Sequence, residues 1–163
     1  MSLGDLAGQY APFQDLSASA TCSQVASYVL TVIKAATAKG AAMNAMLKAQ
    51  MLATALDVYF SDPALGGNKI KAPAPIGGLN IDLTKICKMI DDSSGNATCS
   101  GIYRNASSAF GGSTCLSVSQ ILAYAATQSN PGGSIWYGQV KATQELAKDT
   151  FDAINNRVVF PCP

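Results

Sequence analysis

The 163-residue sequence has no histidine, and charged residues make up only 13% of it. Without histidine, the Ser-His-Asp and Cys-His arrangements of nucleophilic enzymes cannot be built, and the common general base of neutral pH is missing. Glu145 is the single glutamate, so a catalytic carboxylate pair would have to come from aspartates, whose spacing shows no such pattern. Phosphate-binding glycine motifs are also missing. These absences predict a protein that is not an enzyme and needs no cofactor.

The charge balance excludes two further classes. The net charge is +1 and the lysines are scattered, which argues against nucleic acid or an anionic membrane surface as a partner. The longest apolar run is interrupted by Lys34 and is too short to span a bilayer. Hydrophobic residues make up 48%, enough for one folded core. We therefore expect a globular chain with no nucleic-acid partner and no membrane insertion.

The segment 41–60 contains neither glycine nor proline and is rich in strong helix formers. Apolar side chains occupy more than one side of its helical wheel, which is typical of a buried helix. We expect it to be the central helix of an all-α, or nearly all-α, domain of about five helices. Leu52 and Leu56 are its predicted core residues. Residues 1–20 are predicted to be an N-terminal arm with little regular structure, and residues 21–163 a single helical domain.

Two capping-box patterns mark further helix starts, Thr21 with Gln24 and Ser117 with Gln120. The first helix is expected to bury a stripe of residues at helical spacing: Cys22, Val25, Ala26, Val29, Leu30 and Ile33. A last helix is expected at about 137–158. Its inward-facing residues would be Val140, Ala147, Phe151, Ile154 and Val158, and its solvent-facing residues Lys141, Glu145, Lys148, Asp149 and Asp152.

Between these helices the sequence changes character. Apolar residues alternate with polar or small residues on both sides of Gly77-Gly78, which permits a small β-hairpin at 69–82. The spacing of apolar residues at 83–90 indicates a brief helix. Residues 93–115 are rich in Ser, Gly, Asn and Ala and are expected to form a long loop. A connection of that length is usually functional or held by cross-links.

The five cysteines allow two interpretations. They could be buried reduced thiols, or they could form one or two disulfides in a secreted domain. Low charge and many small polar residues favour the second, with the protein extracellular or on a cell surface and a leader that is not part of this sequence. Cys87–Cys99 is the favoured pair, because little else would hold that loop against the predicted helix; Cys115 is the alternative partner for either. Cys22 is the candidate free thiol unless the tail brings Cys162 to it.

Three features could carry ligands. Asp91, Asp92 and Asn96 lie in an oxygen-rich stretch suited to calcium, but it lacks the alternating ligands and closing Glu of an EF-hand, so a solvated helix end is the simpler interpretation. The aromatic residues Tyr103, Trp136 and Tyr137 could bind a sugar or peptide, although an aromatic residue opening a helix more often packs in a core. Two glycosylation sequons begin at Asn96 and Asn105, and in a chain this rich in Asn, Ser and Thr they are at least as readily chance matches.

Three blocks of sequence resemble a known family. They are LKAQMLATALDVYFSDPALGG (47–67), the SAFGGSTCLSVSQILAYA block (108–126, with its flanking residue) and WYGQVKATQELAKDTFDAINN (136–156). Together they resemble an uncharacterised helical domain of large secreted or cell-surface bacterial proteins, over roughly residues 20–156. Relatives often carry an upstream segment of the GYWK or FWxNK type, which this chain lacks, and the region 87–99 resembles an insertion. The resemblance implies a bacterial surface setting but no activity and no functional residues.

From these observations we expect a non-enzymatic structural or interaction module, of the adhesion type, in a bacterial extracellular or cell-surface protein. Its partners would be other domains of the parent protein, or an extracellular protein or carbohydrate. The alternative is a carbohydrate- or matrix-binding module that uses the 93–115 loop together with Trp136 and Tyr137.

Overall fold

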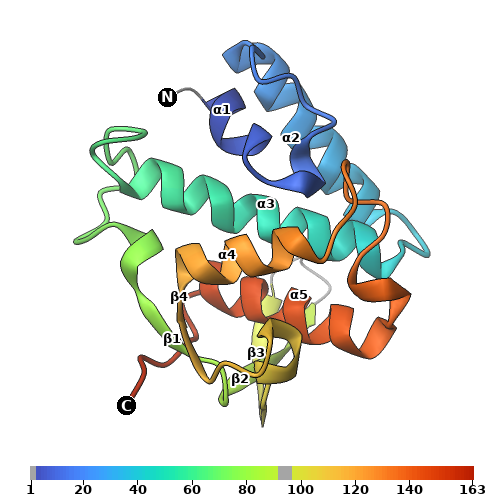
Figure 1. Cartoon of the computed structure of the whole chain (residues 1–163), viewed down its shortest axis with the longest axis vertical. Coiled ribbons are helices and arrows are strands. Elements are labelled where there is room, and N and C mark those ends of the chain that lie inside the picture. Colours follow the sequence, from blue (N-terminus) through green and yellow to red (C-terminus); the bar gives the residue numbers. More distant parts are fainter. Residues whose placement is uncertain (1–2, 92–96) are drawn as a thin grey trace.

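The computed structural model describes residues 3–91 and 97–163, which form five α-helices and two small antiparallel sheets. Figure 1 shows α3 (Met43–Ser61) crossing the middle of the molecule, with α2 (Cys22–Thr37) on one side of it. On the other side lie α4 (Val118–Thr127), α5 (Lys141–Asn155) and the strands. The prediction of an all-α fold is therefore wrong, and the domain is mixed α/β.

The central helix is where the sequence places it. Leu47, Met51 and Thr54 of α3 are fully buried, and Leu52 is nearly so, while Leu56 packs against the core from a half-buried position. The most deeply buried residues of α3 therefore lie on the face of the helix where apolar and polar residues are mixed, and the polar residue Thr54 is one of them. A helix contacted from several sides buries such positions, because no face remains free for solvent.

Both capping boxes form as predicted. The Thr21 backbone N–H donates to Gln24 Oε1 at 2.8 Å, and Gln24 N–H donates to Thr21 Oγ1 at 3.3 Å. Ser117 and Gln120 make the same reciprocal pair at the start of α4. The last helix begins at Lys141, four residues later than predicted, because Gly138 has a left-handed backbone (φ 58°) and Tyr137–Gln139 form a separate 3₁₀ turn.

The strands replace three predicted features. β1 (Asn80–Asp82) pairs with the distant β4 (Cys115–Ser117) and not within a hairpin at 69–82. The predicted brief helix at 83–90 is mostly β2 (Ile86–Asp91), paired with β3 (Ala97–Arg104). The pairing register shifts after Cys87, so Ile86 and Cys87 are buried together, and this adjacent pair imitates helical spacing. β3, a 3₁₀ turn and β4 occupy most of the described part of the predicted 93–115 loop.

The N-terminal arm also has regular structure that the sequence did not predict. It forms α1 (Leu3–Gly8) and a 3₁₀ turn at Ala11–Phe13. The Phe13 side chain is completely buried, and Tyr10 and Leu16 pack against the same core. These three side chains fix the arm to the domain.

The cysteines form two disulfides. Cys87 is joined to Cys99 and Cys115 to Cys162, with Cα–Cα distances of 5.7 and 5.9 Å. The prediction of at least one disulfide is confirmed, and the favoured pair is present, whereas the alternative partners proposed for Cys115 are wrong. Cys22 is the free thiol, but it is exposed and does not belong to a buried stripe.

The faces of two helices differ from prediction. In α2, Leu30 and Ile33 were expected to be buried but are 68% and 47% exposed. In α5, Lys148, Asp149 and Asp152 were expected to face water, but all three are buried, whereas Val140, just before the helix, is exposed. Ala147, Phe151 and Ile154 are buried as predicted.

Candidate functional site

An apolar groove of about 440 Å³ lies between the segment that follows α3, the β1 strand, the start of α4 and the end of α5. Twelve residues line it: Ile70, Lys71, Ala72, Pro73, Ala74, Ile76, Leu79, Ile81, Val118, Ile154, Arg157 and Val159. Its size falls within the range of small-molecule sites, which are typically apolar concavities with a few polar groups. This groove, defined by these residues, is a candidate binding site.

One wall of the groove is the segment between α3 and β1, which is braced by side chains. Asn68 donates from Nδ2 to the Ala72 carbonyl and accepts from the Ala72 N–H at Oδ1, both at 2.9 Å. Ser61, buried at the end of α3, accepts a hydrogen bond from the Ile76 N–H at 2.9 Å. A Cβ on Gly77 would lie 2.5 Å from Ser119 Oγ, so glycine lets this wall approach α4 closely. The groove is thus preformed.

The opposite wall includes Val159, which belongs to the C-terminal tail. The tail lies beside β1: Asp82 N–H donates to the Phe160 carbonyl at 2.9 Å, and Cys162 N–H donates to the Asn80 carbonyl at 3.3 Å. The Cys115–Cys162 disulfide joins the tail to β4 on the other edge of β1. The tail is therefore held by hydrogen bonds and by a covalent cross-link.

Two cations, Lys71 and Arg157, are the charged members of the lining. Both are exposed and both have left-handed backbones, with φ of 53° and 57°. Neither makes an ion pair with another described residue. Asp57 on α3 lies near enough for the Arg157 charge to lower its pKa, but burial of the Asp57 carboxyl is the larger influence and raises it overall. The groove is consequently apolar and positively charged.

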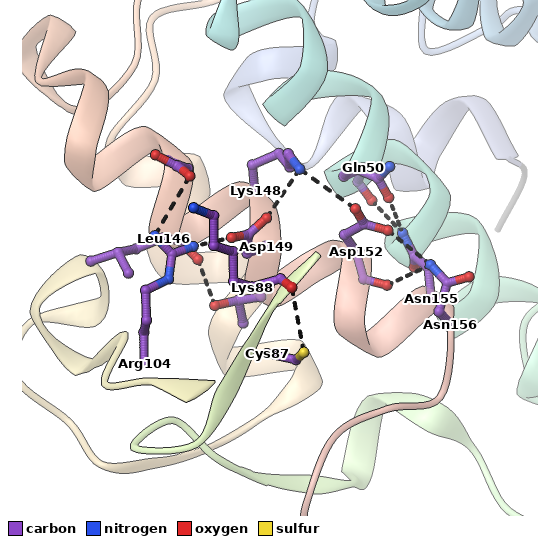
Figure 2. A network of polar contacts seen from close by, with 12 residues as sticks. Gln50, Cys87, Lys88, Arg104, Leu146, Lys148, Asp149, Asp152, Asn155 and Asn156 are labelled. Atoms are coloured by element: carbon purple, nitrogen blue, oxygen red, sulfur yellow. Dashed lines mark hydrogen bonds and ion pairs between the residues drawn. The ribbon is translucent and has the colours of Figure 1, made fainter. Parts of the chain in front are cut away.

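A second polar feature lies on α5 and is buried. Figure 2 shows Lys148 between two aspartates, with its Nζ 3.0 Å from Asp149 Oδ1 and 3.6 Å from Asp152 Oδ2. Arg104 of β3 pairs with Asp149 and approaches Glu145 to 3.5 Å. Burial raises the pKa of Asp149, and the adjacent Lys148 and Arg104 charges offset part of that effect.

Amide side chains extend this buried cluster to α3. Asn155 donates to the Gln50 carbonyl at 3.0 Å and to Gln50 Oε1 at 2.9 Å (Figure 2). The Thr54 hydroxyl donates to Asn155 Oδ1 at 2.8 Å. Asn156 donates to Asp152 Oδ1 at 2.8 Å. The contacts of Asn155 connect α5 with α3, and the ion pairs of Arg104 connect α5 with β3. Opposite charges in this cluster are paired with one another, as in a buried structural ion-pair network.

The aromatic residues proposed from the sequence do not form a binding platform. Trp136 is fully buried, and its Nε1–H donates to the Gly133 carbonyl at 2.8 Å. Tyr137 is 8% exposed, and burial raises the pKa of its hydroxyl. Tyr103 is exposed on β3, where its ring lies 5.6 Å from the ring of Phe160. Stacking on Trp136 would require an exposed ring face, which the structure does not offer.

The remaining candidates from the sequence are only partly described. Asp92 and Asn96 of the proposed calcium stretch lie outside the described residues, and Asn96 is also the acceptor of its sequon, while Asp91 is the last residue of β2. Asn105 is exposed, and its Oδ1 accepts a hydrogen bond from the Ser107 N–H at 2.9 Å. Within residues 3–91 and 97–163, no group of three or more His, Cys, Asp or Glu side chains has an arrangement suited to a metal ion.

Sequence reasoning missed both the groove and the buried cluster. Lys71 follows Asn68 in a segment marked by glycine and proline, a signal for a turn but not for a binding surface. The helices of the described chain include none long and apolar enough to cross a membrane. In comparisons with known proteins, no family model, curated sequence or solved structure matches this chain.

Proposed function

We propose that this chain is a non-enzymatic interaction module of a bacterial extracellular or cell-surface protein, and that it binds an apolar partner in the groove between β1 and the end of α5. The observation that carries the proposal is the groove itself, a braced apolar concavity of about 440 Å³ on a domain whose main charged cluster is internally paired.

The extracellular setting is supported by the two disulfides, because such bonds form and persist in oxidising compartments. The bacterial surface setting comes from the resemblance of the three sequence blocks. A non-enzymatic role is supported by the chemistry that remains available: the sequence has no histidine, and Glu145 pairs with Arg104 while Asp149 pairs with Lys148.

Titration with the neutral apolar dye phenylnaphthylamine tests the groove, because its fluorescence rises in an apolar site. Leu79 lines the groove and is 47% exposed, so Leu79→Glu places a charge in the site without disturbing the core. Leu30→Glu makes the same change on the exposed apolar face of α2, outside the groove.

We expect saturable dye binding by the native protein and by Leu30→Glu, and at least a tenfold loss of affinity in Leu79→Glu. Native-like circular dichroism and melting of both variants would show that the fold is unchanged. Absence of saturable binding to the native protein, or equal binding by Leu79→Glu, would contradict the proposal.

A further inference from the structure

The lining of the groove is selective in its chemistry. Its apolar members are all aliphatic or proline, and its described residues include no aromatic and no acidic side chain. Sugars are usually held by stacking on aromatic side chains, which this lining does not supply. Flexible hydrocarbon chains need only aliphatic contact, so the apolar part of the occupant is best matched by an alkyl chain.

The charges of the groove define the second chemical feature of its occupant. Lys71 and Arg157 are both part of the lining, and neither takes part in an ion pair among the described residues. A guanidinium binds a carboxylate through two parallel hydrogen bonds, and an ammonium adds a point charge that attracts the same group. An anionic group is therefore favoured over a neutral or cationic one.

We infer that the groove binds a linear aliphatic carboxylate, with its hydrocarbon chain on the aliphatic lining and its carboxylate at Lys71 and Arg157. This inference rests on the proposed binding function of the groove and adds the chemical class of its ligand. Asp57 is the acidic group that interacts with Arg157. Its carboxylate competes with the ligand for the guanidinium.

Isothermal titration calorimetry with decanoate, decanol and decyltrimethylammonium tests the inference, with the two ions below their micelle concentrations and decanol below its solubility limit. We expect decanoate to bind about tenfold more tightly than decanol, since two exposed cations each contribute a modest amount. Octanoate should bind roughly tenfold more weakly than decanoate, because two methylenes are removed from the apolar contact. Decyltrimethylammonium should bind more weakly than decanol.

Variants separate the roles of the charges. Lys71→Gln/Arg157→Gln should bring decanoate to the affinity of decanol while leaving decanol binding unchanged; both glutamines keep a Cβ, so the left-handed backbones are no more strained than before. Asp57→Asn should tighten decanoate binding by a few fold, because the competing carboxylate is gone. Lys34→Gln/Lys39→Gln is the matched control for net charge. Lys34 is exposed on α2 and Lys39 is exposed just after it, so this variant should bind decanoate and decanol as the native protein does.

The outcomes distinguish this inference from the proposed function. Equal affinity for decanoate and decanol, or decanoate binding that survives the double substitution, overturns the carboxylate inference while the groove keeps its apolar binding role. Failure of all three alkyl probes together with phenylnaphthylamine overturns both. Binding only to vesicles that contain an anionic phospholipid, with no binding of free decanoate, would also overturn the inference and indicate a membrane surface instead.

Discussion

The helices α2 and α5 have nearly equal lengths, 16 and 15 residues, but they are covered very differently. α2 carries a single charged residue, Lys34, yet buries only Val25 and Val32. α5 carries Lys148, Asp149 and Asp152 in its second half, and every residue of 147–154 is buried. Burial in this domain therefore does not follow the polarity of the helix.

The difference comes from what lies beside each helix. α2 lies at one end of the molecule (Figure 1), where it packs mainly on α3 and less extensively on α1, and its Tyr28 hydroxyl donates to Asp15 of the N-terminal arm. α5 packs on α3 and also on β2, and Arg104 of β3 reaches its charged side. The charged side of α5 can be buried because Lys148 of the same helix and Arg104 of β3 neutralise its carboxylates. A helical wheel shows which face is polar, but it does not show which neighbour will cover that face.

The largest expected contrast concerns apolar truncation on the two helices. Phe151→Ala removes a fully buried ring from α5 and should lower the free energy of unfolding by about 3–5 kcal/mol through lost burial and a cavity. Leu30→Ala on α2 should change it by less than about 0.5 kcal/mol, because the side chain is already mostly in water. Urea denaturation of both variants measures the difference. Equal costs would show that α2 is covered in solution.

The next contrast removes one cation from each environment within α5. Lys148→Met leaves two buried carboxylates without the ammonium between them and should cost about 3 kcal/mol at neutral pH. Lys141→Met makes the same change at an exposed position in the first turn and should cost less than about 0.5 kcal/mol. Chemical denaturation at pH 7 is the measurement. A Lys148→Met protein as stable as the native one would mean that the buried cluster contributes nothing net.

The smallest of the three effects concerns the sheet that covers α5. Replacing Cys87 and Cys99 by serine removes a cross-link with a sequence separation of 12 residues. The free energy of unfolding should fall by about 2–3 kcal/mol, because the unfolded chain gains conformational entropy without the cross-link. Cys22→Ser, which alters the free thiol on α2, should leave the melting temperature unchanged. Thermal melts under non-reducing conditions compare the two. Loss of stability in Cys22→Ser would assign that thiol a structural role.

The local parts of the fold could be predicted from the sequence. The starts of α2 and α4 depend on capping boxes only a few residues long, and α3 follows from a continuous run of helix formers. The strands could not be predicted in the same way. β1 finds its partner β4 more than thirty residues away, and the irregular register of β2 hides its alternation.

The binding groove was beyond prediction for a related reason. Ile70, Val118 and Val159 meet in it from three remote parts of the chain, and each alone reads as an ordinary apolar residue. The cross-link that positions Val159 was also not predicted, because five cysteines allow several pairings that spacing does not distinguish. Trp136 was named as a candidate binding residue, with core packing as the more frequent role of an aromatic residue that opens a helix, and the structure places it in the core.

The Cys115–Cys162 disulfide has a mechanical consequence. If the chain is pulled by its two ends, the force passes directly from Cys162 to Cys115 through the disulfide. The chain between these two cysteines, whose sequence separation is 47, then bears no force. At about 3.4 Å per residue, the cross-link removes roughly 160 Å from the length to which the chain can be stretched. α4 and α5 lie wholly inside this shielded part, whereas α2 and α3 lie on the loaded path. Under tension the N-terminal helices would be drawn out first, while α5 and the tail beside the groove remain slack.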